Sequence, residues 1–276
     1  MNAKTAPDDR YTVPALQRGL QLLMQFSREE RELTGAELSR RLQLPRASVF
    51  RMLHTLEKMG FVERADDGNA YKLGLAVLRL GFELLASMEL TEYGRPVIEA
   101  LRDRCGYAAH LVVRDGREIV FIAKAHGHNS LFQSIQVGAR LPAHATVLGR
   151  LLLSDLDLPA LRQLYPDEPL KAYTARTPTT VEQLKAMIDA DRANGYGVSQ
   201  GGFETGISTI AAPVFNDRGE VAAVVSITVP GQRIDDHELP RLIEAVKDAA
   251  AQLTERISHL PHRGAWPTRT PDRKAA

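Results

Sequence analysis

The spacing of apolar residues over the first 74 positions predicts three helices followed by a β-hairpin. Apolar side chains recur at intervals of three and four residues in 14–27, 34–42 and 45–60, which is the period of an amphipathic helix. The second segment begins with a capping-box pattern, and the third ends at a glycine that can adopt the left-handed conformation. Segments 61–64 and 71–73 flank an Asp-Asp-Gly-Asn turn, as the strands of a hairpin do. Three helices and a hairpin indicate the winged form of the helix-turn-helix.

The next segment, 75–90, is a predicted helix with an unusually wide apolar surface. Leu75, Leu78, Phe82 and Leu85 lie on one side, and further apolar residues neighbour them. A helix that is apolar over so much of its circumference must be covered by other atoms. A partner subunit is the natural candidate, so we expect this helix to contribute to dimerisation.

Beyond residue 90, helical and strand periods alternate. Strands are predicted at 107–114, 118–125, 131–137, 208–215 and 220–229. Helices are predicted at 91–104, 144–154, 157–164, 181–194 and 236–260. Antiparallel strands with helices around them predict an α+β domain.

Composition excludes two classes of protein. Of the 276 residues, 44% are hydrophobic and 25% are charged, so the chain can bury a core and is not wholly disordered. The 35 Lys and Arg residues balance 34 Asp and Glu residues, for a formal net charge of +1, which excludes a polycation that coats nucleic acid. Basic residues nevertheless gather between positions 38 and 58, where they face only Glu57: Arg40, Arg41, Arg46, Arg51 and Lys58. Any contact with nucleic acid must therefore be local.

The sequence also indicates the compartment. Cys105 is its single cysteine, which excludes an intramolecular disulfide and a multi-cysteine metal site and fits a reducing environment. No apolar run approaches the ~18 residues that span a bilayer, and the polar N-terminus lacks a signal-peptide core. We therefore expect a cytoplasmic protein without a membrane partner.

The segment between Thr34 and Gly60 offers side chains suited to DNA. A recognition helix needs short residues for close approach and donors that reach base edges, which Arg46, Ser48 and Arg51 supply. The candidate DNA-binding residues, with those for phosphate and wing contacts, are Arg18, Arg40, Arg41, Arg46, Ala47, Ser48, Phe50, Arg51, Arg64, Asn69 and Lys72. The alternative is an ordinary helical hairpin whose charges are hydrated, and the adjoining β-hairpin with its basic residues favours DNA.

Short motifs recur along both halves of the chain. In the N-terminal part they are 16–20 (LQRGL), 36–39 (AELS), 44–53 (LPRASVFRML) and 71–74 (YKLG). In the C-terminal part they are 138–146 (GARLPAHAT), 195–198 (GYGV), 206–214 (GISTIAAPV) and 226–230 (SITVP). In identity and order, from about residue 11 to residue 260, these motifs resemble those of IclR-type bacterial transcriptional regulators.

The resemblance implies a winged helix-turn-helix, a linker helix that helps dimerisation, and a GAF-like α/β effector-binding domain with a six-stranded sheet. It implies a ligand-responsive regulator that binds a near-palindromic operator in double-stranded DNA as a homodimer or homotetramer, with a small organic or aromatic acid as effector. The domains expected are a disordered N-terminus (1–10), the DNA-binding domain (11–74), the linker helix (75–90), the effector-binding domain (91–260) and a disordered tail (261–276).

The resemblance also implies an effector pocket. Carried over by position, its residues are Ser130, Gln133, Val147, Leu148, Ser199, Ile207, Thr209, Ser226 and Thr228. Many family members are acidic where this chain continues from Ser199, and here the same stretch brings Phe203 to the rim. Fixed hydroxyl donors among apolar walls suit a small carboxylate. The alternative for each hydroxyl is a strand residue whose hydrogen bonds are satisfied within the protein.

Two other functions compete with this interpretation. Residues 197–201 match the Gly-x-Ser-x-Gly nucleophile elbow, which would make Ser199 the nucleophile of a serine hydrolase. That elbow requires a strand, a strained turn and a helix, whereas a glycine-rich loop and another strand follow here, so we predict no enzyme and no catalytic residue. A sensory module that acts through protein contacts without DNA is opposed by the predicted helix-turn-helix.

Histidines could in principle form a metal site, because imidazole is a ligand of zinc, copper and nickel. The candidates are His110, His126, His128 and His144. Without cysteines or a nearby carboxylate, a pair of loop histidines is the commoner meaning of this pattern. We predict no metal and no cofactor.

Overall fold

The computed structural model describes residues 11–27, 29–66, 68–87, 89–127 and 135–258. The chain divides into two compact units, Met1–Leu84 and Leu85–Ala276, and each has a core of its own. The ends for which disorder was predicted, 1–10 and 261–276, lie outside the described residues.

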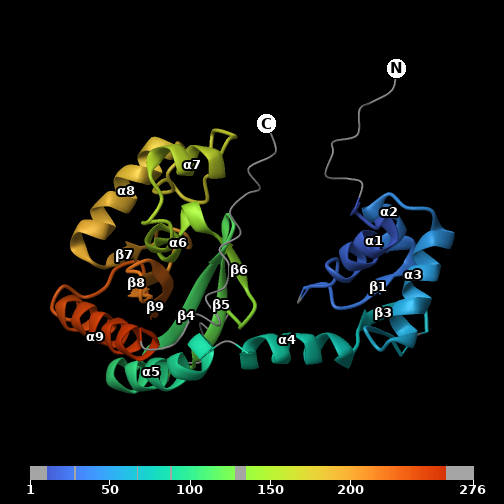
Figure 1. The fold of residues 1–276 in the computed structure, drawn as a ribbon, viewed down its shortest axis with the longest axis horizontal. Helices are drawn as coiled ribbons and strands as arrows, with labels where there is room; N and C mark the ends of the chain where they lie inside the picture. Colours follow the sequence, from blue (N-terminus) through green and yellow to red (C-terminus); the bar gives the residue numbers. More distant parts are fainter. Residues whose placement is uncertain (1–10, 28, 67, 88, 128–134, 259–276) are drawn as a thin grey trace. The chain divides into compact units, whose positions relative to one another are not determined.

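The first unit combines helices with a small antiparallel sheet (Figure 1). Its helices are α1 (Pro14–Leu23), α2 (Gly35–Leu42), α3 (Arg46–Lys58) and α4 (Leu75–Ser87), the last of which continues past the division between the units. Its strands are β1 (Leu33–Thr34), β2 (Val62–Arg64) and β3 (Ala70–Leu73), in the order β1-β3-β2. The structure confirms the three helices and the hairpin, and β1 extends the hairpin by pairing Leu33 with Tyr71.

Helix α1 ends at Leu23 rather than at Ser27, where the apolar spacing had placed its end. The amides of Gln25 and Phe26 donate to carbonyls only three residues back, at 3.1 and 3.4 Å, so the chain tightens into a turn. This turn returns the Phe26 ring to the core, where it is buried. The chain therefore leaves the helix after Leu23 and buries the Phe26 ring instead of forming another helical turn.

The turn between α2 and α3 fixes how these helices meet. Gln43 adopts a left-handed φ of 54°, and the Ser39 hydroxyl donates to the Leu44 carbonyl at 2.6 Å. Pro45 then precedes α3, where its missing amide costs no helical hydrogen bond. The resulting core consists of Leu22, Phe26, Leu33, Leu38, Val49, Leu53, Val62 and Tyr71.

The second unit is a six-stranded antiparallel sheet in the order β6-β5-β4-β9-β8-β7. Its strands are β4 (Ala108–Asp115), β5 (Glu118–Ala125), β6 (Arg140–Pro142), β7 (Gly197–Gln200), β8 (Ile207–Phe215) and β9 (Val221–Pro230). Its helices are α5 (Glu89–Cys105), the 3-10 turn η3 (Ala143–Ala145), α6 (Val147–Leu152), α7 (Leu158–Leu164), α8 (Val181–Asn194) and α9 (Leu239–Ile257). The predicted α+β class is confirmed.

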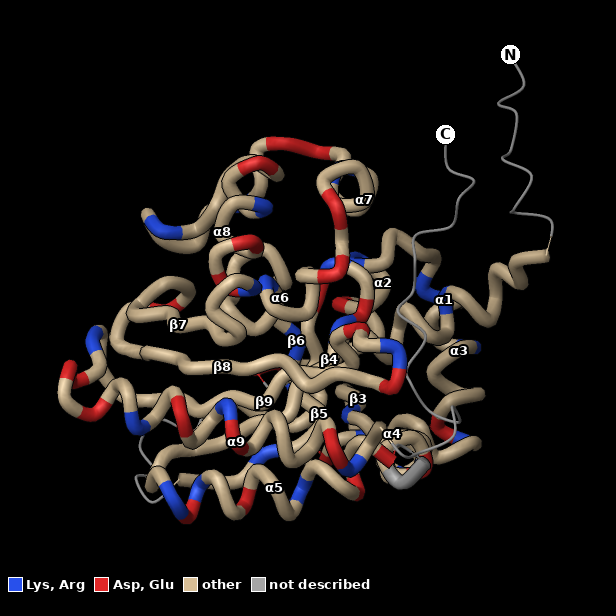
Figure 2. The backbone as a smooth tube through the Cα atoms, turned by 60° about the vertical axis from the view of Figure 1, so that its left-hand side comes forward, with Lys and Arg blue, Asp and Glu red and all other residues tan. Residues whose placement is uncertain are grey.

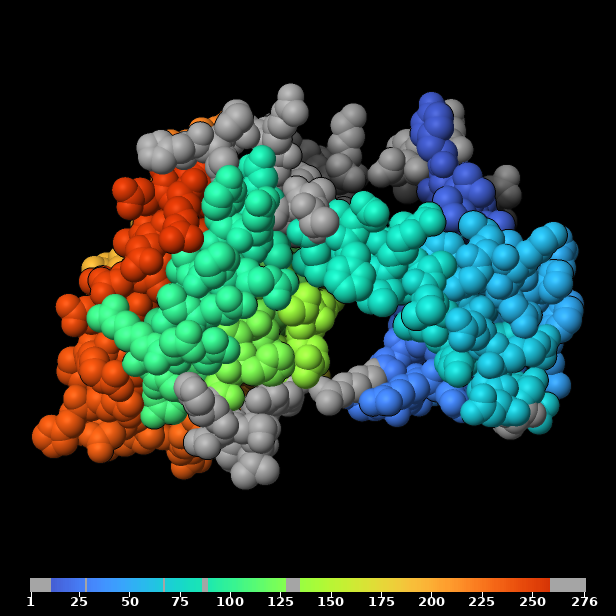
Figure 3. Space-filling model, turned by 90° about the horizontal axis from the view of Figure 1, so that it is seen from below, coloured from blue at the N-terminus to red at the C-terminus, as the bar shows by residue number. Residues whose placement is uncertain are grey.

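Alternation along the strands divides the sheet between two cores. Residues such as Ile210 and Ala212 pack with α5 and α9, which lie side by side on one face (Figure 3). Ala211, between them, packs with α6, α7 and α8 on the other face (Figure 1). The outer surfaces of α5 and α9 carry both signs of charge, as solvated helices do (Figure 2).

The edge of the sheet differs from the prediction. Most of the strand predicted at 131–137 lies outside the described residues, and its described remainder, 135–137, is not a strand. This edge is formed instead by β6, which pairs with β5 so that Leu141 lies opposite Ile119. A three-residue strand is too short to show a periodicity of its own.

Helix α6 approaches the backbone of η3 closely. A Cβ atom at Gly149 would lie 2.0 Å from the Ala143 carbonyl oxygen. The adjacent Arg150 forms a buried ion pair with Asp191 of α8, with Nε and Oδ2 2.6 Å apart. The position of α6 over the sheet therefore depends on the absence of a Cβ atom at Gly149 and on the ion pair between Arg150 and Asp191.

Replacing Gly149 with alanine should destabilise the second unit by about 1–3 kcal/mol, because the new methyl must displace backbone atoms. The matched control is Gly19→Ala in α1, where an added Cβ meets nothing within 4 Å. That control should gain about 0.5–1 kcal/mol, since alanine favours a helix over glycine. Thermal unfolding followed by circular dichroism measures both variants, and an unchanged Tm for Gly149→Ala would contradict the packing argument.

Candidate DNA-binding surface and ligand pocket

Helix α3 presents one face to the core and the opposite face to solvent. Val49 and Leu53 are buried, whereas Ala47, Phe50 and Arg51 are exposed, with 59% of Phe50 accessible. The exposed face of α3 thus combines an arginine with a phenylalanine, and these side chains suit contact with base edges and thymine methyl groups. His54, one turn after Phe50, is also exposed on this face. The sequence analysis did not single out His54, although this residue follows Phe50 by four positions and so lies on the same face of the helix.

The arginines of α3 and α2 differ in their partners. Among the residues that the structure describes, no carboxylate pairs with Arg46 or Arg51. Arg40 and Arg41 both pair with Glu37 at 2.7 Å, and Arg41 also reaches Glu30 at 2.6 Å. Hydrogen bonds from Arg40 and Arg41 lower the pKa of Glu37 to about 2. The positive charge of α3 is thus uncompensated, while that of α2 is shared with acidic neighbours.

The predicted wing is held together by Arg64. Its guanidinium pairs with Glu57 of α3 at 3.0 Å, donates to the Gly68 carbonyl at 3.1 Å and lies 5.1 Å from the centre of the Tyr71 ring. Arg64 therefore orders the hairpin against α3. Lys72 is half-buried on β3, and Asn69 is exposed at the turn.

A groove of about 900 Å³ runs between α1, α3 and α4 in the first unit. Arg18, Ser48 and Arg51 line it, so these three predicted DNA-binding residues border the groove as well. Most of its other lining is apolar: Leu16, Leu20, Leu23, Met52, Leu56, Met59, Phe61, Val77, Leu80 and Leu84. The wide apolar surface predicted for the linker helix is therefore present, with 56% of Leu80 and 60% of Phe82 exposed in the chain by itself.

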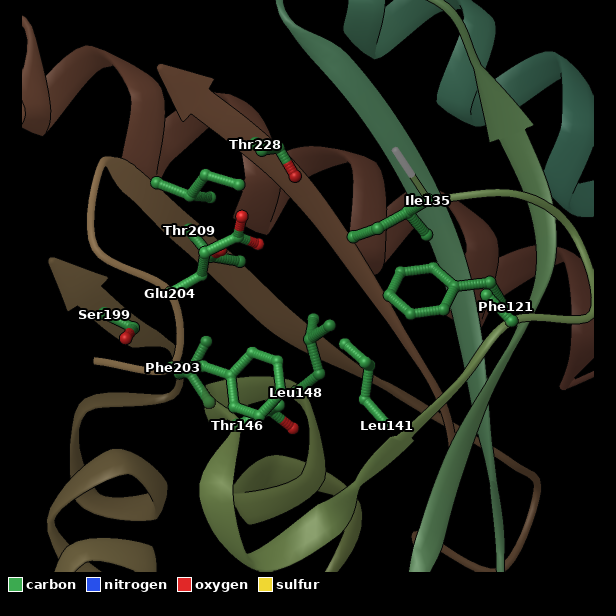
Figure 4. A pocket seen from close by; sticks show the side chains of 13 residues that line it. Phe121, Ile135, Leu141, Thr146, Leu148, Ser199, Phe203, Glu204, Thr209 and Thr228 are labelled. Atoms are coloured by element: carbon green, nitrogen blue, oxygen red, sulfur yellow. The ribbon is translucent and has the colours of Figure 1, made fainter. Parts of the chain in front are cut away.

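The second unit contains a pocket of about 260 Å³ over strands β7, β8 and β9. The strand register places Ser199 opposite Thr209 and Thr209 opposite Thr228, so three hydroxyl residues form one row across three strands. All three line the pocket, and Figure 4 shows them at one end of it together with Glu204. The antiparallel register thus creates a polar end from residues far apart in sequence.

The opposite end of the pocket is apolar. Phe121, Ile135, Leu141 and Leu148 converge there from β5, the segment before β6, β6 and α6 (Figure 4). Phe203 lies at the rim, where its ring is 4.9 Å from that of Tyr173. A polar end and an apolar end define a site for a small amphiphilic molecule.

The structure brings most of the predicted pocket residues together. Those that line the pocket are Val147, Leu148, Ser199, Phe203, Ile207, Thr209 and Thr228. Ser130 and Gln133 lie outside the described residues. The sequence reasoning missed further lining residues, namely Phe121, Ile135, Ala139, Leu141, Thr146 and Glu204. Apolar alternation could have indicated Phe121, whereas the direction of Glu204 depends on a loop.

Ser226 differs from the other predicted pocket residues because it does not line the cavity. It lies two residues before Thr228, on the same face of β9, but it is fully buried opposite His110 of β4. In the described part of the chain, neither Ser226 Oγ nor His110 Nδ1 has a hydrogen-bond partner. Burial lowers the pKa of His110 to about 3, so its ring is neutral, and it packs edge-on against Phe121 at 5.5 Å.

The hydrolase alternative lacks its structural context. Ser199 lies within strand β7, and the chain continues through a loop into β8, so no strand–turn–helix elbow forms around it. Of the candidate metal ligands, His144 is buried with Nε2 3.0 Å from the Lys171 carbonyl oxygen. His128 lies outside the described residues, among which no group of three or more potential ligands could hold a metal ion.

The combined features define a class of protein. An exposed helix whose arginines have no carboxylate partner among the described residues, placed by a helix-turn-helix and followed by a hairpin that carries Arg64 and Lys72, suits contact with double-stranded DNA. The second unit of the same chain contains a pocket of a size suited to a small molecule. The molecule is a DNA-binding transcriptional regulator.

Comparisons with known proteins give the family. The IclR helix-turn-helix domain matches residues 15–66, and the C-terminal domain of the bacterial transcriptional regulator IclR matches residues 82–255. The Pca regulon regulatory protein of Pseudomonas putida is 36% identical over 245 residues, which cover 87% of this chain and 84% of that protein. The chain belongs to the IclR family of bacterial transcriptional regulators.

Solved structures agree with this assignment. An IclR transcriptional regulator from Alicyclobacillus acidocaldarius is 27% identical, with a TM-score of 0.78 over 89% of this chain and 99% of that one. An IclR homologue from Microbacterium hydrocarbonoxydans, solved in complex with 4-hydroxybenzoate, is 24% identical, with a TM-score of 0.76 over 88% of this chain and 98% of that one. The second likeness shows the fold alone. In the part of the chain that the structure describes, no helix has the length and apolar composition to cross a membrane.

The different partners of Arg51 and Arg40 predict different losses on DNA. Arg51→Ala should weaken binding to an operator selected from a random pool by about tenfold or more, because a bidentate contact to guanine discriminates by roughly 1–3 kcal/mol. It should weaken binding to random duplex much less. Arg40→Ala should weaken both duplexes by the same factor, since a phosphate contact carries no sequence information. Fluorescence anisotropy measures these affinities, and equal losses for both variants on both duplexes would contradict the division.

Proposed function

We propose that this regulator binds a near-palindromic operator as a homodimer, or as a pair of dimers, and that a small aromatic acid in the pocket of the second unit changes its affinity for DNA. The observation that carries the proposal is the row Ser199, Thr209 and Thr228, facing an apolar enclosure in a chain that also presents Arg51 on a recognition helix. The protein would act in the cytoplasm, where the bacterial chromosome lies.

Direct base reading is assigned to the exposed face of α3. In the described part of the chain, Arg46 and Arg51 have no carboxylate partner to leave before they contact DNA, so their charge is available for guanine and phosphate. Arg40 and Arg41 must share their donors with Glu30 and Glu37. They therefore suit phosphate contacts that position the protein rather than contacts that specify sequence.

The dimer is assigned to the apolar surfaces of α1 and α4. The groove lined by Leu16, Leu20, Leu80 and Leu84 is too apolar to remain in water without cost, since patches of this kind mark interaction sites. A second copy of the chain offers the same helices, which is the condition for a two-fold symmetric interface. Two recognition helices related by such an axis read half-sites about one DNA turn apart.

The effector is assigned to the pocket by size and lining. A cavity of about 260 Å³ accommodates a single substituted ring, and the walls formed by Phe121, Leu141 and Leu148 suit its faces. Hydroxyl groups of the row can meet the polar substituents. The Microbacterium hydrocarbonoxydans homologue was solved with 4-hydroxybenzoate, which makes this acid a suitable first probe.

Ligand binding can affect DNA binding only through a difference in affinity. An effector that binds the DNA-competent and DNA-incompetent arrangements equally well shifts nothing. Helix α4 joins the two units covalently, and it also carries exposed apolar residues of the proposed dimer surface. A change in the effector domain would therefore reach the recognition helices through the packing of α4 in the dimer.

The pocket assignment is tested by Thr209→Trp, which fills the polar end. We expect operator affinity within a factor of about two of wild type, and loss of the thermal stabilisation that an excess of 4-hydroxybenzoate gives by mass action. Gln252→Trp, on the exposed surface of α9, is the matched control and should retain the stabilisation. A normal ligand-induced rise in Tm for Thr209→Trp would remove the pocket from the mechanism.

The dimer assignment is tested by Leu80→Asp. A buried carboxylate without a partner opposes association, so the variant should run as a single chain in light scattering at concentrations where wild type runs as two. Arg79→Asp, on the neighbouring exposed position of α4, is the control for added negative charge. If both variants remain dimeric with operator affinity intact, the dimer forms elsewhere.

A further inference from the structure

We propose that Glu204 determines which effectors enter the pocket, by accepting a hydrogen bond from a donor group on the ligand. The preferred class would then be a ring that carries a hydroxyl or amino group at the end facing β8 and β9, rather than a ring whose only polar group is a carboxylate. This inference rests on the proposed function of the pocket as the effector site.

The loop that carries Glu204 is held in place. The Thr174 hydroxyl donates to the Gly202 carbonyl at 2.6 Å, and the Phe203 ring lies against Tyr173. On the other side of Glu204, the Gly231 amide donates to the Gly206 carbonyl at 2.7 Å. These contacts hold the backbone on both sides of Glu204 and keep the residue beside the pocket that it lines.

The Glu204 carboxylate points into the cavity. Figure 4 shows it turned toward Thr209 and Thr228, at the polar end of the pocket. Among the described residues it has no ion-pair or hydrogen-bond partner, so the glutamate is not used for local structure. A ligand group is therefore free to become its partner.

The charge of the pocket selects against anions at this end. None of the 13 residues described as its lining is Lys, Arg or His, so nothing in the lining neutralises Glu204. A carboxylate without its proton can only accept hydrogen bonds. A ligand carboxylate beside it would meet like charge, whereas a phenolic hydroxyl would gain a charge-assisted hydrogen bond.

The apolar end fixes the orientation of the ligand. Phe121, Ile135 and Leu141 leave no donor for a polar group, so the ring lies there and its donor substituent faces Glu204. For a ring whose polar group is a hydroxyl, this places the hydroxyl among Ser199, Thr209 and Thr228. The hydroxyl row then completes the donor and acceptor set around the ligand hydroxyl.

The test compares two uncharged rings that differ only in this group, phenol and toluene, by isothermal titration calorimetry. Wild type should bind phenol at least tenfold more tightly, the range expected for a hydrogen bond to a charged group. In Glu204→Gln the preference should fall severalfold, because a neutral acceptor bonds more weakly. In Glu204→Met it should fall further, to the residual preference that Ser199, Thr209 and Thr228 provide.

The control is Glu99→Gln on the exposed surface of α5, which changes the net charge equally and should keep the wild-type preference. Thermal unfolding of the Glu204 variants checks that the fold is retained. If both compounds bind and the ratio of their affinities is the same in wild type and Glu204→Met, the role of Glu204 is wrong while the pocket stands. If neither compound binds wild type, the role of Glu204 also fails, and the response of Thr209→Trp to 4-hydroxybenzoate decides separately whether the pocket is the effector site.

Discussion

The antiparallel sheet of the second unit is buried on both faces, and this constraint governs the pocket. Every strand residue must point toward α5 and α9 or toward α6, α7 and α8, so a shift of register by one residue would exchange the two cores. A hydroxyl group buried on an interior face without a hydrogen-bond partner costs free energy, as at Ser226. Ser199, Thr209 and Thr228 avoid this cost because their row borders a cavity. The site is thus a local exception within a sheet built for apolar packing.

In the first unit, the distribution of ion pairs matters more than the number of charges. Glu30 and Glu37 neutralise the arginines of α2, while those of α3 remain without acidic partners among the described residues. General attraction to phosphate is therefore moderated, and the uncompensated charge is concentrated where base edges are read. A net charge of +1 is compatible with selective DNA binding for this reason.

The two units use the same physical device for different purposes. In each, an apolar surface is left incompletely covered: the groove beside α4 in one and the walls of the pocket in the other. A second copy of the chain would fill the first, and a small ring would fill the second. Both associations gain free energy from removing apolar surface from water, and polar groups then restrict what can bind. Glu204 imposes that restriction in the pocket through charge rather than shape.

The sequence by itself determined the elements of the first unit, the α+β class and the family. The elements and the class depend on side-chain periods, caps and turns, which involve residues close together in the sequence. The family was indicated by short motifs that resemble those of IclR-type regulators in identity and order. Only the tertiary structure decided the early end of α1 at Leu23, the edge strand β6, the burial of Ser226 away from the cavity and the inward direction of Glu204. Each of these depends on contacts between distant segments: the Phe26 ring in its core, the register of β5 and β6, and the loop packed on Tyr173. Contacts of this kind join residues far apart in the sequence. The pattern of neighbouring residues therefore does not reveal them.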